Sequence, residues 1–143
     1  MMVSTKGRYA LRVMIDLAQC DPDAYIPLAD IAARQEISEK YLESIISILS
    51  KNGFVKALRG KGGGYKLARA PEDYTVGSIL KLTEGSLAPV ACLEGEENTC
   101  RRAGQCRTLR MWTELNNIIN NYFENITIAD LLLDDPEVQN YSI

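Results

Sequence analysis

Apolar side chains in the first third of the chain recur at the three- and four-residue spacings that are typical of buried helix faces. The pattern predicts helices over residues 5–19 and 28–35, and a third that begins behind Ser38 as its N-cap and stops at Asn52-Gly53. The inward positions are Tyr9, Leu11, Val13, Met14, Leu17 and Ala18, then Leu28, Ile31 and Ala32, then Tyr41, Leu42, Ile45, Ile46 and Leu49. The second and third helices are joined by a turn of about three residues, which is the helix-turn-helix pattern.

Two short alternating segments follow directly, FVKALRG and GGYKLAR, and glycines separate them. Alternation of this kind around a glycine turn predicts a β-hairpin. A helix-turn-helix followed by a glycine-tipped hairpin describes a winged helix. The fold class we expect is therefore mainly α with a small β-hairpin.

The second half of the chain predicts a short helix over residues 75–84, an irregular loop over residues 85–106, and a long helix over residues 107–126. Thr127 is expected to cap a last short helix, IADLLL, ahead of a frayed acidic tail. We therefore divide the chain into four parts. These are a DNA-binding winged helix-turn-helix at 1–84, a cysteine-bearing loop at 85–106, a long helix with a short terminal helix at 107–133, and the tail at 134–143.

Charge is distributed unevenly along the 143 residues, whose formal net charge is −3. Residues 1–69 hold 11 Lys and Arg against 7 Asp and Glu, whereas residues 70–143 hold 5 against 12. Residues 51–69 contain only basic charges, at Lys51, Lys56, Arg59, Lys61, Lys66 and Arg69, which create a local positive field. No apolar run approaches the ~18 residues that span a bilayer, so we expect a cytoplasmic protein without a membrane anchor.

The glycine-rich stretch RGKGGGYKLAR does not fit the nucleotide-binding motifs. A Walker loop needs Ser or Thr after its lysine, and Gly62 follows Lys61; a dinucleotide fingerprint needs a third glycine where Tyr65 stands. A tight turn that uses glycine for positive φ remains, either alone or as the tip of a DNA-binding wing. Basic residues in the tip favour the wing, because arginine suits the negative potential of a narrow minor groove.

Candidate DNA contacts come from the predicted recognition helix, the wing and nearby basic positions. Ser38 and Tyr41 suit phosphates, and Lys40 suits a phosphate or a guanine. Glu43 either accepts a hydrogen bond from a cytosine amino group or is an ordinary solvated helix position. The full set is Lys6, Ser38, Lys40, Tyr41, Glu43, Lys51, Arg59, Gly60, Lys61 and Gly62.

Three cysteines, Cys92, Cys100 and Cys106, lie in one polar segment, with seven and then five residues between them. Thiolates gathered on one loop can hold a metal or an iron-sulfur cluster. The paired spacing that is usual for zinc ligands is missing. Cys20, at the end of the first helix, is expected to be a packed or idle thiol. The chain has no histidine, which removes every Cys-His or Ser-His catalytic pair.

Taken together, the segments STKGRYALRVMIDLA, PLADIAARQEISEKYLE, LRGKGGGYKLAR and WTELNNIINNYFENITIADLL and the three-cysteine loop resemble the IscR-type winged-helix regulators of bacteria. The resemblance implies a homodimer through the long helix, double-stranded DNA as partner, and a 2Fe-2S cluster on Cys92, Cys100 and Cys106. It also implies base reading near Glu43 and a wing arginine at Arg59. Leu109 and Arg8 depart from the histidine and the aspartate that serve as fourth cluster ligands in two branches of the family, so the fourth ligand stays open.

The function that we expect is that of a dimeric transcriptional regulator, not an enzyme, which senses iron-sulfur status, redox state or nitric oxide through a 2Fe-2S cluster. A cluster-free repressor of the same fold that senses thiols or a partner is the first alternative. A cysteine-nucleophile enzyme and a zinc-stabilised interaction module are further alternatives, which turnover and metal analysis would distinguish.

Overall fold

The computed structural model describes residues 3–134, and the predicted tail beyond Asp134 lies outside them. In chain order the elements are α1 (Thr5–Ala18), α2 (Leu28–Gln35), α3 (Glu39–Lys51), β1 (Val55–Leu58), β2 (Gly64–Leu67), α4 (Val76–Glu84), α5 (Leu109–Glu124) and α6 (Ile128–Leu133). Short 3-10 turns lie at Pro71–Asp73, Ala91–Leu93 and Ala103–Gln105. The mainly helical fold with one antiparallel hairpin confirms the predicted fold class.

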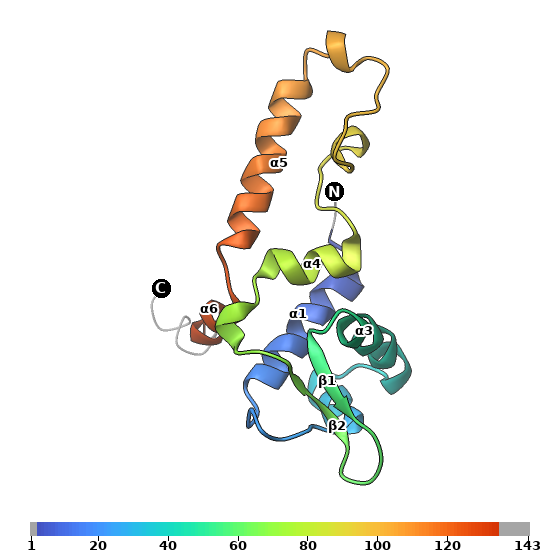
Figure 1. Ribbon diagram of the computed structural model, residues 1–143, viewed down its shortest axis with the longest axis vertical. Coiled ribbons are helices and arrows are strands. Elements are labelled where there is room, and N and C mark those ends of the chain that lie inside the picture. Colours follow the sequence, from blue (N-terminus) through green and yellow to red (C-terminus); the bar gives the residue numbers. More distant parts are fainter. Residues whose placement is uncertain (1–2, 135–143) are drawn as a thin grey trace.

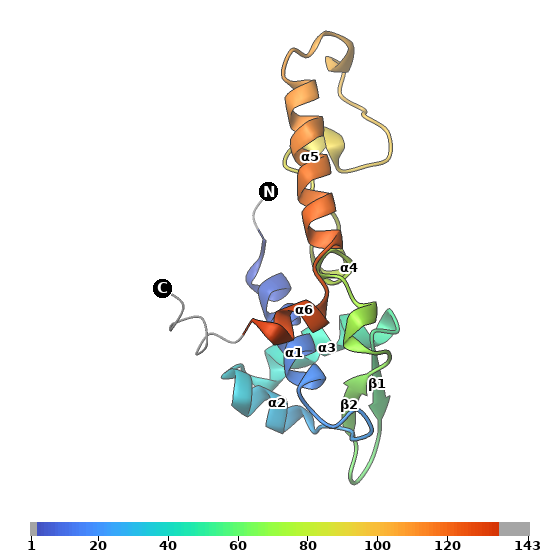
Figure 2. The same cartoon turned by 90° about the vertical axis from the view of Figure 1, so that its left-hand side faces the viewer.

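The molecule has a compact body from which one long helix projects (Figures 1 and 2). The body contains α1 to α4, α6 and the hairpin, and its core gathers around the buried face of α1. Helix α5 extends away from the body, and the loop after α4 runs up to its far end. The hairpin loop points out at the opposite end of the molecule.

The predicted helix starts are confirmed by side-chain caps. The Ser38 hydroxyl accepts a hydrogen bond from the Tyr41 N–H at 3.2 Å, and Thr75 caps α4 by accepting from the Ser78 N–H at 3.0 Å. Thr127 and Asp130 form a reciprocal capping box at the start of α6. These caps place the starts of α3, α4 and α6 where the sequence predicts them. Helix α5 begins without a side-chain cap and is shorter at both ends than residues 107–126.

A buried polar network joins α1 to α2. The Asp16 carboxylate is only 4% exposed and accepts hydrogen bonds from the Arg34 guanidinium at 2.7 and 3.1 Å and from the Gln35 amide at 2.8 Å. Arg12 donates to the Gln35 side chain and carbonyl in turn. Sequence analysis missed Asp16, because its helical spacing gives no sign that a carboxylate is buried.

Tyr74 ties the base of the hairpin to the core. Its side chain is completely buried, and its hydroxyl donates to the Phe54 carbonyl at 2.7 Å. The same oxygen accepts from the backbone N–H groups of Ala68 at 3.1 Å and Arg69 at 2.9 Å. Both ends of the hairpin are therefore attached to one side chain.

Candidate nucleic-acid interface and cysteine loop

The outer face of α3 is polar and its inner face is apolar. Leu42, Ile45, Ile46 and Leu49 are buried, whereas Ser38, Lys40, Glu43, Ser44 and Ser47 are exposed. Tyr41 is half-buried, because its ring packs edge-on against Tyr9 with centroids 5.9 Å apart. With Glu39 and Lys51, which are also exposed, the outer face presents hydroxyls, two ammonium groups and two carboxylates, while the inner face anchors the helix.

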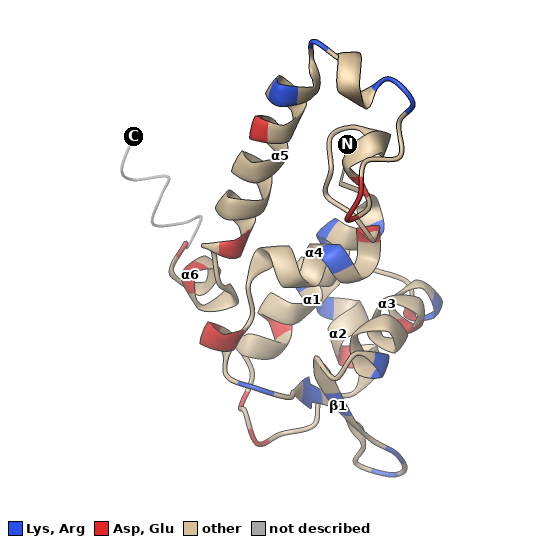
Figure 3. Cartoon of the chain, turned by 45° about the horizontal axis from the view of Figure 1, so that its top comes forward, with Lys and Arg blue, Asp and Glu red and all other residues tan. Residues whose placement is uncertain are grey.

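The tip of the hairpin is held open to solvent by its glycines. Gly60 and Gly62 adopt φ values of 96° and 79°, which side chains with a Cβ rarely adopt. The N–H of Gly63 closes the turn on the carbonyl of Gly60 at 3.0 Å. Arg59 and Lys61 are exposed on this tip, and neither belongs to an ion pair within residues 3–134. Figure 3 shows blue, basic segments on the hairpin loop, which extends beyond the body.

Helix α3 and the hairpin border one groove. On the α3 side it is lined by Glu43, Ser47 and Lys51, and on the hairpin side by Leu58, Arg59 and Gly60 among others. The structure therefore brings together Glu43, Lys51, Arg59 and Gly60 from the predicted set. Ser47 and Leu58 were missed, because nothing in their local sequence separates them from ordinary helix and strand positions.

The other predicted DNA contacts do not line this groove. Ser38, Lys40 and Tyr41 stand at the start of α3, and Lys61 and Gly62 stand at the hairpin tip. Lys6 lies apart from both, half-buried in the first turn of α1.

The cysteine loop connects α4 to α5 and carries the three predicted ligands at different exposures. Cys92 is half-buried in the turn Ala91–Leu93, and Cys100 and Cys106 are exposed. Within residues 3–134, no three Cys, His, Asp or Glu side chains lie close enough together to hold a metal ion. The three thiols of the loop are therefore not gathered at one site.

Two thiols have perturbed pKa values, in opposite directions. The pKa of Cys106 is lowered chiefly by its contact with the Thr108 hydroxyl at 3.4 Å, then by the backbone at Thr108. Burial raises the pKa of Cys20, whose thiol donates to the Asp16 carbonyl at 3.3 Å. Of these two thiols, Cys106 is therefore the more reactive at neutral pH, and Cys20 behaves as a packed thiol.

The thiols of the loop are the right kind of ligand for an iron-sulfur cluster, but three thiols are fewer than the four ligands that such a cluster usually has. Such clusters are held by thiolates, and three exposed or half-buried thiols lie on one loop here. Arg101, Arg102 and Arg107 on the same loop can offset the negative charge of a thiolate-bound cluster. A fourth ligand has to come from another group.

Comparison with known proteins gives consistent matches along nearly the whole chain. Residues 3–134 match the Rrf2 family model, described as an iron-dependent transcriptional regulator. The chain is 39% identical over 132 residues to the HTH-type transcriptional regulator IscR of Yersinia pseudotuberculosis, covering 92% of this chain and 79% of that protein.

Solved structures agree in fold. CymR, described as the global cysteine regulator of B. subtilis, superposes with a TM-score of 0.76 at 35% identity, covering 94% of this chain and 98% of that one. IscR of T. potens superposes with a TM-score of 0.75 at 39% identity, covering 97% and 91%. Within the described residues, no helix has the length and apolar character needed to cross a membrane.

Proposed function

Because this chain belongs to the Rrf2 family of transcriptional regulators, we propose that it acts as a homodimer that binds double-stranded DNA. Through a 2Fe-2S cluster, it would sense iron-sulfur status, redox state or nitric oxide. The observation that carries the proposal is the groove shared by α3 and the hairpin, where Lys51 and Arg59 have no ion-pair partner among residues 3–134. Members of this family are regulators and not enzymes, and the chain lacks histidine.

DNA binding follows from the shapes of the two elements. An α-helix fits the major groove, and the polar outer face of α3 can meet base edges and phosphates there. The glycine-tipped hairpin then reaches the neighbouring minor groove, where the Arg59 guanidinium meets enhanced negative potential. Lys61 beside it adds a phosphate contact, which binds without reading sequence.

The second copy of the chain is argued from α5. Its outward side carries a continuous apolar stripe whose members are 37% to 64% exposed: Met111, Leu115, Ile118 and Tyr122. Its other apolar side, with Ile119 and Phe123, packs against α4. An exposed apolar stripe along a projecting helix is typical of a helix that pairs with its twin.

Dimerisation is tested by replacing Ile118, the most exposed residue of the stripe, with Asp. Sedimentation should show monomers, because the charge would be buried between two helices. Asn117→Asp puts the same charge on the exposed polar side of α5 and should remain dimeric. A dimeric Ile118→Asp variant would remove α5 as the pairing surface.

For the cluster, Cys92, Cys100 and Cys106 would supply three thiolates. When bound, the cluster supplies a centre that changes on oxidation, loss of iron or reaction with nitric oxide. The loop that carries the thiols runs directly into α5, so ordering the loop acts on the helix that we assign to dimerisation.

The cluster proposal is tested by anaerobic purification, followed by visible absorbance and iron and sulfide analysis. Cys100→Ala should lose colour and iron, whereas Cys20→Ala should keep both, because Cys20 is a packed thiol on α1. Loss of colour in Cys20→Ala, or retained colour in Cys100→Ala, would contradict the assigned ligand set.

A cluster-free regulator is the second candidate, and two observations favour it. The three thiols of the described loop are not gathered at one site, and CymR, described as the global cysteine regulator of B. subtilis, has a closely similar fold. In that case the lowered pKa of Cys106 makes this thiol the reacting group. Anaerobic protein that contains no iron yet binds DNA, with affinity that depends on thiol oxidation, would favour this candidate.

A further inference from the structure

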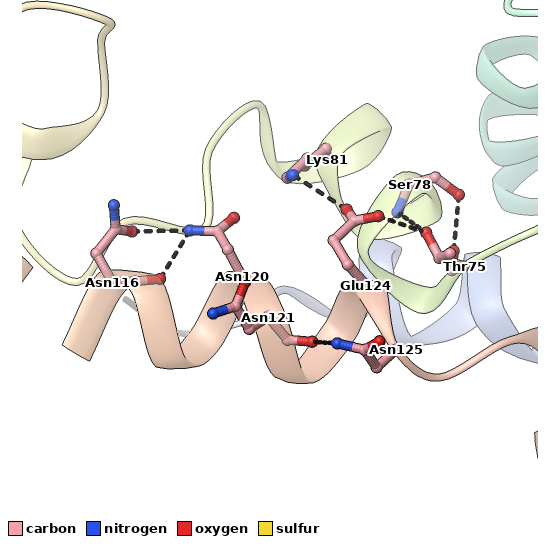
Figure 4. Close-up of polar contacts among 8 residues, drawn as sticks. All are labelled: Thr75, Ser78, Lys81, Asn116, Asn120, Asn121, Glu124 and Asn125. Carbon is pink, nitrogen blue, oxygen red and sulfur yellow. Dashed lines mark hydrogen bonds and ion pairs between the residues drawn. The ribbon is translucent and has the colours of Figure 1, made fainter. Parts of the chain in front are cut away.

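The carboxylate of Glu124, the last residue of α5, reaches across to α4. It lies 3.1 Å from the Lys81 ammonium, and its second oxygen accepts a hydrogen bond from the Thr75 hydroxyl at 3.1 Å (Figure 4). Thr75 is the N-cap of α4, so one hydroxyl serves both the cap and the contact with α5. Glu124 therefore joins the root of the projecting helix to the start of α4.

This position of Glu124 is explained by α4 and not by α5. A carboxylate at the C-terminal end of a helix faces that helix's own negative pole, which disfavours it. The same carboxylate lies at the N-terminal end of α4, whose positive pole and N–H groups favour an anion. The ion pair with Lys81 is close to half-exposed on both sides and contributes little by itself, so close fit matters more than charge.

Gly77, the second residue of α4, makes this close fit possible. A Cβ built on Gly77 would collide with the Glu124 carboxylate, so a side chain at this position would push that carboxylate away from Lys81 and Thr75. The same Cβ would lie 3.4 Å from the Glu124 backbone nitrogen, which is an ordinary van der Waals contact. Gly77 does not have a positive φ, so its backbone conformation does not require glycine. Glycine is a poor helix former, and its presence here is explained by the approach of α5.

Backbone contacts continue the same junction. The Val76 N–H donates to the Ile126 carbonyl at 2.8 Å, and the Ile128 N–H donates to the Tyr74 carbonyl at 3.0 Å. The chain after α5 is thus attached to the chain before α4. Glu124 is the residue that extends this attachment into the last turn of α5.

We propose that the contact between Glu124 and Gly77 sets the direction in which α5 leaves the body, and thereby the spacing of the two recognition helices in the dimer. A helix of 16 residues is ~24 Å long, so a ~10° change at its root moves its far end by ~4 Å. Half-sites on DNA lie about 34 Å apart per helical turn, and such a shift disturbs simultaneous binding of both. This inference rests on the proposed function.

The experiment compares a palindromic duplex, selected with the wild-type protein from random sequences, with a duplex carrying one half-site. A series of palindromes whose half-sites are moved apart by single base pairs is bound in parallel. Gly77→Ala should leave half-site affinity within about twofold and lower the palindrome-to-half-site ratio about tenfold, because bivalent binding needs matched geometry. The preferred half-site spacing should shift or broaden.

A double-mutant cycle and a matched control distinguish loss of the contact between Gly77 and Glu124 from general destabilisation of the fold. In a Glu124→Ala background the added methyl of Gly77→Ala has room, so it should change the ratio less than about twofold. Glu114→Gln removes a carboxylate from the same helix whose only ion pair in the described chain is with Arg110 on α5, and should behave as wild type.

A folded, dimeric Gly77→Ala variant with the wild-type ratio and spacing preference would overturn the inference. If Gly77→Ala does not fold, Glu124→Ala decides, and an unchanged ratio in that variant overturns it too. A wild-type protein that is monomeric, or that binds both duplexes equally, would instead remove the proposed function and this inference with it. That outcome is visible before any variant is made.

Discussion

Replacing Tyr74 by Phe removes one oxygen from the base of the wing and leaves its other contacts in place. The ring remains against Phe54, with centroids 5.4 Å apart, and beneath the Arg69 guanidinium at 4.9 Å. What is lost is the hydroxyl that connects Phe54, Ala68 and Arg69. The variant therefore separates the contribution of the Tyr74 hydroxyl from that of the ring packing around it.

The size of the effect follows from which groups lose a partner. The Ala68 N–H also donates to the Phe54 carbonyl at 3.2 Å, so these two groups retain each other. The Arg69 N–H loses the hydroxyl acceptor at 2.9 Å and is left next to a buried ring. One unsatisfied donor costs about 1–3 kcal/mol, and we expect a loss of unfolding free energy in that range.

Urea unfolding at fixed protein concentration measures this loss, because the stability of the proposed dimer would depend on concentration. The midpoint should fall without a change in slope, and Tm should fall by roughly 2–4 °C per kcal/mol. Tyr25→Phe, which keeps the ring that lies under the Lys66 ammonium, is the control and should stay within about 0.5 kcal/mol. If Tyr74→Phe also changes the free energy of unfolding by less than about 0.5 kcal/mol, the Tyr74 hydroxyl does not stabilise the base of the hairpin.

Three further outcomes are expected. Arg59→Ala should weaken binding of the palindrome about tenfold or more at fixed salt, with Arg59→Lys in between, as measured by fluorescence anisotropy; unchanged affinity would exclude the wing. Asp16→Ala should lower the free energy of unfolding in urea by roughly 1–3 kcal/mol, because Gln35 and the half-exposed Arg34 lose their shared acceptor. An unchanged free energy of unfolding would show that the network does not stabilise the fold. The pKa of Cys106 is lowered and that of Cys20 is raised, so in the apo protein iodoacetamide should alkylate Cys106 with a midpoint at lower pH than Cys20. Mass spectrometry of the peptides measures both midpoints. Thr108→Val should raise the midpoint of Cys106.

The local elements were predictable because their signals are local. Ser38 and Thr127 are predicted to cap the helices that follow them, and both caps are present. Thr75, the first residue of the helix predicted at 75–84, is itself the cap of α4. The glycine-tipped hairpin follows from alternation and from the positive φ of its turn, and Gly60 and Gly62 confirm it. The family resemblance is confirmed by the match over residues 3–134.

Contacts between distant segments could not be obtained in this way. Asp16 and Tyr74 read as ordinary positions in their own segments, and their roles depend on which backbone or side-chain groups packing brings to them. In its own segment Gly77 is only a poor helix former, and its role becomes visible when the structure places Glu124 of α5 against it. The grouping of Glu43 with Arg59 in one groove likewise needs the hairpin to fold back beside α3.

The sequence by itself determined the order of helices, the hairpin, the placement of basic charge and the thiols available on one loop, because each depends on neighbours within a few residues. Only the tertiary structure decided which polar groups are buried, how α5 is attached to the body, and that the apolar stripe of α5 is left uncovered. Periodicity identifies that a helix has an apolar side, but burial depends on what packs against it. The physical reason is that solvent exclusion is a property of the assembled chain.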